Sequence, residues 1–485
     1  MWTRPLGTLY RAFPSLTFPT IHRSPLNLEE PLRRTSIFIG LGLTLTLLSG
    51  FPGILPGQEA APPQIDTRIY DIIAGASVER VEADIRTLAN FGTRNTFSDT
   101  LSDTRGIGAA RRWIKAEFDR ISTECGGCLE VFFQTTTIPA STRVPTETAV
   151  VSVVAIQRGT RYPNRYVLMS GDIDSRASNN FDGETEAPGA NDNASGMAGT
   201  LEAARLLTRH TFPTSIVYAG LSAEEQGLYG GRKLAAVARE EGWDIIAVLN
   251  NDMIGNTEGI DGIKDNTTFR VFSEPTPATD SLRDHQARRT RGGEVDGPSR
   301  QIARYVDRIA ELYFPNLTAR MVYRLDRFGR SGHHRPFNDV GFPAVRIMET
   351  HENYNRQHQD LRVEDGIEYG DVVEWVDFQY ATTLTALNAA VLAALAWAPP
   401  APEGVTIGGS NRPSTTLSWT VANDPDLGGY RVYWRDTTAP QWEHSRWVGK
   451  VDRYTLENVI IDNYLFGVAA VGKNGNESPV VFPGR

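Results

Sequence analysis

Cysteine is the residue that this chain nearly lacks, with two among 485 residues. Both lie in the segment Glu-Cys-Gly-Gly-Cys-Leu, as Cys125 and Cys128. This spacing is typical of redox motifs and of half a zinc site, but the sequence contains no second pair that would complete such a site. We therefore prefer a local disulfide in a tight Gly-Gly loop, which requires an oxidising compartment.

The chain also has fewer basic than acidic residues. The chain has 49 Lys and Arg against 58 Asp and Glu, a net charge of −9 at pH 7. Nucleic-acid binding depends on a basic surface, so this balance argues against a nucleic-acid partner. We interpret the basic run at residues 288–291 as a solvated loop.

Residues 1–62 have the layout of a secretory signal. Arg33 and Arg34 precede an apolar stretch at 37–48, and Pro52 and the small residues of 59–62 follow it. This order predicts export, to a periplasm or to the outside of the cell. An uncleaved N-terminal membrane anchor is the alternative, although the stretch is short and glycine-rich for a spanning helix. Export also favours the disulfide.

Residues 63–398 alternate between short apolar runs and helical patterns. This alternation predicts an α/β fold, with a mostly parallel mixed sheet covered by helices on both faces. The expected strands are residues 129–133, 149–155, 166–169, 215–221, 245–249 and 344–348. The expected helices are residues 78–91, 104–121, 195–208, 228–240 and 371–395.

Residues 399–485 have a different sequence pattern from the segment before them. Residues 399–402 are rich in proline and predict a stiff linker. Alternating apolar segments then predict a C-terminal all-β sandwich, with strands at 415–420, 430–434 and 464–469. Trp419 on an early strand and Tyr464 at the start of a late one resemble a fibronectin type III module. We expect it to serve in spacing, stability or attachment to extracellular or envelope components.

Acidic residues and one histidine recur at the ends of the predicted strands. Open α/β sheets bind ligands at the carboxyl ends of their strands, so we expect these side chains to converge there. Together they can hold two divalent ions. The group consists of Asp172, Asp192, Glu224, Glu225, Asp252 and His358. Because Glu224 and Glu225 are adjacent and point in different directions, one can ligate while the other acts as a general base.

Three motifs in this region resemble the co-catalytic di-zinc aminopeptidases, which are relatives of bacterial leucyl aminopeptidase, glutamate carboxypeptidase and glutaminyl cyclase. They are Gly-Ala-Asn-Asp-Asn-Ala-Ser-Gly at 189–196, Ser-Ala-Glu-Glu-Gln-Gly-Leu at 222–228 and Asn-Asp-Met-Ile-Gly at 251–255. Residues 87–94 are similar to the opening helix of that family. The resemblance covers about residues 78 to 396.

The resemblance implies a role for each residue. Asp192 would bridge two metal ions, with Glu225 and His358 completing a first site for zinc. Asp172 and Asp252 would complete the second site, Glu224 would be the general base, and Asp174 would support the metal site.

Two departures from the family pattern affect these roles. Asp172-Ile173-Asp174 replaces His-x-Asp, which makes the second site all-carboxylate and open to Zn²⁺, Mn²⁺ or Mg²⁺. The family's Tyr-His is stretched from Tyr354 to His358, so His351 and His334 compete with His358 as the ligand. We prefer His358 because Gln359-Asp360 follow it. His333, His334 and Tyr354 are expected to contact substrate or to form local hydrogen bonds near the pocket.

The leading hypothesis is an exported metallo-aminopeptidase that acts on peptides with a free N-terminus, whose α-amine would lie in the acidic pocket. One alternative is a glutaminyl cyclase, an acyltransferase for which one zinc at Asp192, Glu225 and His358 would suffice. The other is a binding homologue that has lost catalysis.

Overall fold

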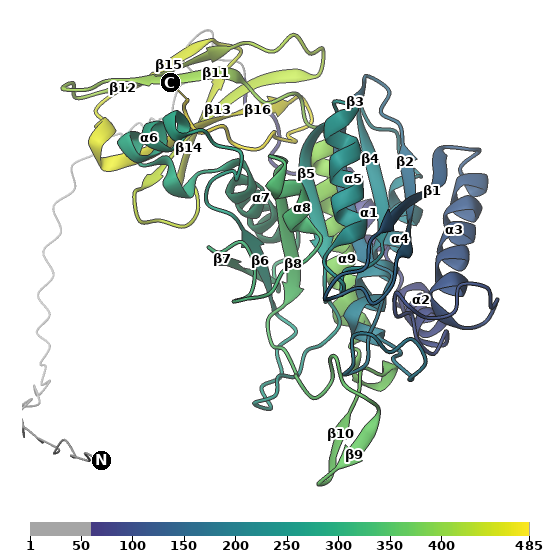
Figure 1. Ribbon diagram of the computed structural model, residues 1–485. Coiled ribbons are helices and arrows are strands. Elements are labelled where there is room, and N and C mark those ends of the chain that lie inside the picture. The colour runs from purple at the N-terminus through teal and green to yellow at the C-terminus, as the bar shows by residue number, and fades with distance from the viewer. Residues whose placement is uncertain (1–59, 485) are drawn as a thin grey trace, which may run out of the picture. The chain divides into compact units, whose positions relative to one another are not determined.

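The computed structural model describes residues 60–484, so nearly all of the predicted signal or anchor segment lies outside the described residues. A mixed eight-stranded sheet forms the centre of the fold, in the order β1-β2-β4-β3-β5-β8-β6-β7 (Figure 1). Its strands are β1 (Leu129–Ile138), β2 (Thr148–Gln157), β3 (Tyr162–Asp172), β4 (Thr214–Leu221), β5 (Asp244–Asn251), β6 (Thr268–Ser273), β7 (Thr318–Val322) and β8 (Ala344–Glu349).

The middle of this sheet is parallel. Strand β3 pairs in parallel with β4 and β5, and β5 pairs in parallel with β8. Strands β1, β2 and β4 pair antiparallel at one side, and β6 pairs antiparallel with β8 at the other. The carboxyl ends of β3, β4 and β5 therefore lie side by side at one edge.

Helices cover both faces of the sheet, as predicted. One apolar core includes buried residues of α2, α3, α4, α7 and α9, and a second core on the sheet includes residues of α5 and α8. The helices are α1 (Thr67–Gly75), α2 (Val78–Ala89), α3 (Gly106–Glu124), α4 (Gly196–Leu207), α5 (Tyr229–Glu240), α6 (Leu282–Arg291), α7 (Pro298–Tyr313), α8 (His334–Asp339) and α9 (Phe378–Trp397). Helix α9 is long and apolar enough to cross a membrane, but it is almost wholly buried inside the protein, as a core helix is.

Two sequence-based expectations need correction. Residues 288–291 form the last turn of α6 rather than a loop, because Ser281 and Asp284 cap the start of that helix reciprocally. The helix expected over 371–395 begins later, at Phe378, where Asp377 caps it. The predicted disulfide is confirmed, since Cys125 and Cys128 are bonded directly after α3.

The C-terminal region consists of two small antiparallel sheets. One has the order β11-β12-β15 and the other β14-β13-β16. Buried side chains that include Trp419, Tyr430 and Phe466 form a core of their own between them. The strands are β11 (Glu403–Gly408), β12 (Thr415–Thr420), β13 (Leu427–Asp436), β14 (His444–Gly449), β15 (Arg453–Leu456) and β16 (Tyr464–Gly472). Residues 399–402 join α9 to β11.

Candidate metal centre

The carboxyl ends of β3, β4 and β5 bring together the acidic residues singled out in the sequence. Asp172 is the last residue of β3, and Asp252 directly follows β5. Glu224 and Glu225 lie in the loop between β4 and α5. Asp192 lies at a kink in the segment Ala190–Ser195, which leads into α4.

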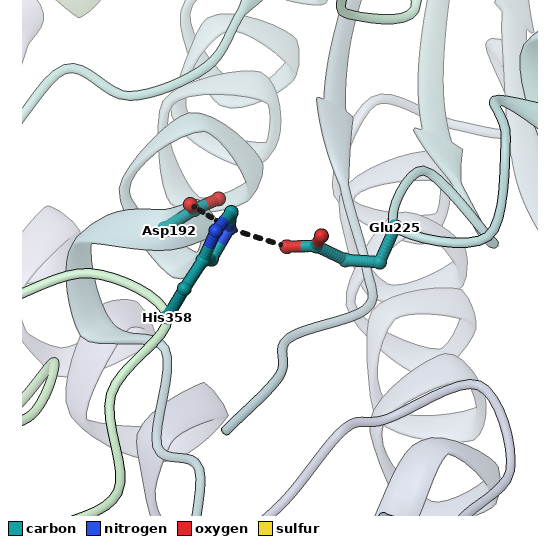
Figure 2. A group of neighbouring side chains, drawn as sticks. All are labelled: Asp192, Glu225 and His358. Carbon is teal, nitrogen blue, oxygen red and sulfur yellow. Dashed lines mark ion pairs between the residues drawn. The ribbon is translucent and has the colours of Figure 1, made fainter. Parts of the chain in front are cut away.

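Asp192, Glu225 and His358 form one compact group, in which one potential donor atom from each lies within 4.8 Å of the others. The Nε2 atom of His358 is 3.0 Å from Asp192 Oδ2 and 2.8 Å from Glu225 Oε1 (Figure 2). The competing histidines lie elsewhere. His334 is hydrogen-bonded to the carbonyl oxygen of Leu325, and Nε2 of His351 lies 3.7 Å from Asp265 Oδ2.

This group fits a zinc ion. Two carboxylates and one imidazole are ligands that zinc accepts, and three protein ligands leave a position open for water or substrate. Burial disfavours the charge on His358, but the carboxylates of Glu225 and Asp192 outweigh that effect and raise its pKa to about 10. The two carboxylates therefore create a strongly negative local field that favours a cation.

Supporting residues hold these ligands in place. Asp174 accepts hydrogen bonds of 3.1 Å from the backbone N–H groups of both Glu224 and Glu225, which fixes their loop. Asp371 accepts hydrogen bonds of 2.8 and 2.7 Å from the backbone N–H groups of Asn191 and Asp192. Sequence reasoning identified Asp174 but missed Asp371, which precedes α9 and is separated from Asp192 by 179 residues.

Glu224 has the environment of a proton-transfer group. It is half-buried and lines the cavity that also contains Asp192, Glu225 and His358. Burial, together with the charge of Glu225, raises its pKa well above the ordinary glutamate value. A raised pKa favours the return of a proton that the carboxylate has accepted, as a group that acts first as a base and then as an acid must do.

The residues expected at the second metal site have other partners. Asp172 Oδ1 lies 2.6 Å from His333 Nδ1, and Asp172 Oδ2 accepts a 2.6 Å hydrogen bond from Asn193. Asp252 Oδ2 lies 2.9 Å from Nη2 of the buried Arg346. Within residues 60–484, Asp172, Asp192 and Asp252 do not form a group with donor atoms within 4.8 Å of one another. These side chains, as placed, do not fit a second ion.

The cavity at this centre has a volume of about 600 Å³. Its lining includes Asp192, Glu224, Glu225, Asp252 and His358. His333, His334 and Tyr354 are not part of that lining. His333 contacts Asp172 instead, and Tyr354 is half exposed.

Comparisons with known proteins identify the family of this chain. The model of peptidase family M28 matches residues 152–381. A probable zinc metalloprotease of Leptosphaeria maculans is 40% identical over 422 residues, which cover 87% of this chain and 98% of that protein. A probable zinc metalloprotease of Pyricularia oryzae is 39% identical over 440 residues, covering 89% and 88% of the two chains.

Two solved structures are also similar to this chain, at lower identity. LapA of Legionella pneumophila is 18% identical, with a TM-score of 0.50 over 70% of this chain and 79% of that chain. The Porphyromonas gingivalis glutaminyl cyclase is 17% identical, with a TM-score of 0.45 over 65% of this chain and 97% of that chain. The family model and the extended similarity to the fungal relatives show that the chain belongs to peptidase family M28 and is a zinc metallopeptidase.

Proposed function

We propose that the protein is an exported aminopeptidase that removes N-terminal residues from peptides, with Glu224 as its general base. The observation that carries this proposal is the position of Glu224, which lines one open cavity with Asp192, Glu225 and His358, the three candidate zinc ligands. The carboxylates of that cavity would attract the free α-amine of a peptide, and this would direct cleavage to its N-terminal end.

Asp192, Glu225 and His358 would hold the zinc ion. When bound there, zinc polarises the scissile carbonyl and acidifies water. Glu224 accepts a proton from the attacking water and later returns it to the nitrogen of the leaving amine. Asp174 fixes the backbone of Glu224 and Glu225 because its carboxylate accepts hydrogen bonds from the N–H groups of both residues.

The Glu224→Gln variant tests this role. The change retains the shape of the side chain but removes the proton acceptor, so kcat should fall about a hundredfold or more. Zinc content, measured by mass spectrometry of the metal, should stay at the wild-type level. Glu240→Gln, at the exposed end of α5, is the matched control and should retain full activity. A Glu224→Gln enzyme with near wild-type kcat would refute the mechanism.

A glutaminyl cyclase is the second candidate function. It is favoured by the single assembled group of three metal donors among the described residues, because one zinc would suffice for cyclisation. A peptide with N-terminal glutamine separates the two functions. Loss of ammonia with retention of the residue indicates cyclisation, whereas release of free glutamine indicates aminopeptidase activity.

Export is the remaining part of the proposal. The disulfide between Cys125 and Cys128 supports it, because such bonds persist in oxidising compartments. Fractionation of cells that produce the full chain should find the protein outside the cytosol. Retention of the whole population in the cytosol with reduced cysteines would contradict this assignment.

A further inference from the structure

The cavity at the metal centre is lined by arginines as well as by carboxylates. Six arginines contribute to its wall, against the four carboxylates Asp192, Glu224, Glu225 and Asp252. The whole chain has the opposite balance, with more acidic than basic residues. The arginines are Arg143, Arg176, Arg232, Arg327, Arg330 and Arg335, and we call them the arginine rim. They come from the β1–β2 loop, the segment after β3, helices α5 and α8, and the β7–α8 connection.

Two of these six guanidinium groups form no ion pair with the described residues. Arg176 lies 3.6 Å from Glu225, and Arg335 lies 3.8 Å from Asp339. Arg327 lies 2.8 Å from Glu352 and is paired. By contrast, Arg143 and Arg232 form no ion pair among the described residues, and each donates to a backbone carbonyl, of Glu225 and Gly227 respectively. Arg330 lies 3.8 Å from Glu352, which Arg327 already occupies.

Unpaired guanidinium groups around a concave site bind anions. The planar donors of arginine match both oxygens of a carboxylate, and bonds between two charged groups are stronger than those between neutral ones. Several like charges held on one small wall repel one another, so a bound anion would also relieve that repulsion. The arginine rim surrounds the cavity that contains Glu224, so such an anion would be part of the substrate itself.

We propose that the arginine rim selects substrates that carry a carboxylate close to the scissile bond. This inference rests on the proposed function, since it identifies the substrate class of the same site. The carboxylate has two possible sources. It is either the side chain of an N-terminal aspartate or glutamate, or the terminal α-carboxylate of a very short peptide.

Two pairs of substrates distinguish these sources with the zinc-loaded full-length enzyme. Glutamyl against glutaminyl nitroanilide tests the side chain, and a dipeptide against its C-terminal amide tests the α-carboxylate. In at least one pair, kcat/KM should favour the carboxylate about tenfold or more, the ratio expected for one charge-assisted hydrogen bond. Ratios near one, or preference for the neutral member, in both pairs would overturn the inference.

Variants on helix α5 connect this preference to the arginine rim. Arg232→Gln should lower the ratio of charged to neutral substrate about tenfold. A general structural defect would instead lower kcat/KM for both substrates and leave their ratio unchanged, which would count against the proposal. Arg239→Gln, on an exposed part of the same helix outside the cavity, is the matched control and should keep the wild-type ratio.

A binding measurement separates this inference from the proposed function. Calorimetry with the zinc-loaded Glu224→Gln protein should show tighter binding of L-glutamate than of L-glutamine if the side-chain carboxylate is recognised, or of L-glutamine than of L-glutaminamide if the α-carboxylate is recognised. If peptides are hydrolysed without charge preference and neither pair differs in affinity, the inference fails and the proposed function stands. If no peptide is hydrolysed but the charged member of a pair still binds more tightly, the proposed function fails and the anion site stands.

A second, independent observation concerns the second cation position of the family. Arg346 is completely buried on β8 and contacts the carboxylates of both Asp252 and Asp326, at 2.9 and 3.0 Å. Its Nε also donates to the backbone carbonyl oxygen of Asp252. Both oxygens of Asp172 are engaged by His333 and Asn193.

We infer that the guanidinium of Arg346 takes the place of the second cation, so the centre holds a single zinc ion. A dication at Asp252 would lie next to this buried positive charge, and repulsion between charges is strong in a low-dielectric interior. The arginine supplies a fixed positive charge at this position without occupying a coordination site.

Metal stoichiometry tests this second inference without reference to activity. Full-length protein dialysed against buffered zinc should contain one tightly bound zinc per chain, by elemental analysis and native mass spectrometry. Two equally tight zinc ions per chain would overturn the inference. Arg346→Met should, if it folds, raise the capacity for a second divalent ion. If that variant does not fold, the wild-type stoichiometry alone still decides.

Discussion

Asp296 joins the catalytic region to the C-terminal sheets, and its replacement gives a stringent test of how firmly they are attached. Its carboxylate lies 2.6 Å from Arg304 of α7 and 2.8 Å from Arg435 of β13. The exposed fractions of these three residues are 2%, 2% and 1%. Asp296→Asn keeps the shape of the side chain but leaves two buried guanidinium groups without this carboxylate.

The expected cost is large because the unpaired charges cannot reach water. Breaking a buried ion pair by removing one partner typically costs about 3–5 kcal/mol. Urea unfolding of the full-length protein, followed by tryptophan fluorescence, should show a loss of this size with an unchanged m-value. Asp103→Asn is the control, because Asp103 is highly exposed and lies 3.5 Å from Arg112, and it should change stability by less than about 1 kcal/mol. A similarly small change for Asp296→Asn would refute the reasoning.

Two further predictions concern zinc binding and acid stability. Asp371→Asn removes the carboxylate that accepts hydrogen bonds from the N–H groups of Asn191 and Asp192. Zinc affinity, measured by chelator competition, should therefore fall about tenfold to a hundredfold. An unchanged Kd for zinc would contradict this positioning role. Burial disfavours the charged form of Glu352, but the charges of Arg327 and Arg270 outweigh burial and lower its pKa from 4.5 to about 2. A group whose pKa is lower in the folded state stabilises the protein at pH values above its unfolded-state pKa. This stabilisation is lost as the pH falls through its folded-state pKa. Glu352→Gln should therefore lower Tm at pH 7, with the difference shrinking between about pH 4.5 and pH 2; a difference independent of pH would be inconsistent with this assignment.

The central strands could be predicted from the sequence because they are short, continuous apolar runs. Strands β6 and β7 were not predicted, since polar residues such as Arg270 and Arg320 interrupt their apolar pattern. Helix α7 was also missed, although its apolar residues follow helical spacing, because it follows an arginine-rich segment that was interpreted as loop. The signal that could have identified it is Pro298 at its first position, a common helix start.

The convergence of Asp192, Glu225 and His358 could be predicted because each follows a strand or lies in a recognisable motif. The partners of Asp172 and Asp252 could not, because sequence gives no information on contacts between distant segments. His333 is 161 residues from Asp172, and Arg346 is 94 residues from Asp252. A charged residue within the apolar strand β8 was the available signal for Arg346, since a fully buried arginine is usually paired.

The two inferences are connected by charge. With one zinc ion, its positive charge is balanced by Asp192 and Glu225, and Arg346 balances Asp252. Asp172 is engaged by its own hydrogen-bonding partners. Arg143 and Arg232 of the arginine rim form no ion pair with these carboxylates and donate instead to backbone carbonyl oxygens. Their positive charge remains available to bind a substrate carboxylate. One site can therefore hold a buried arginine in place of a second metal ion and also select anionic substrates.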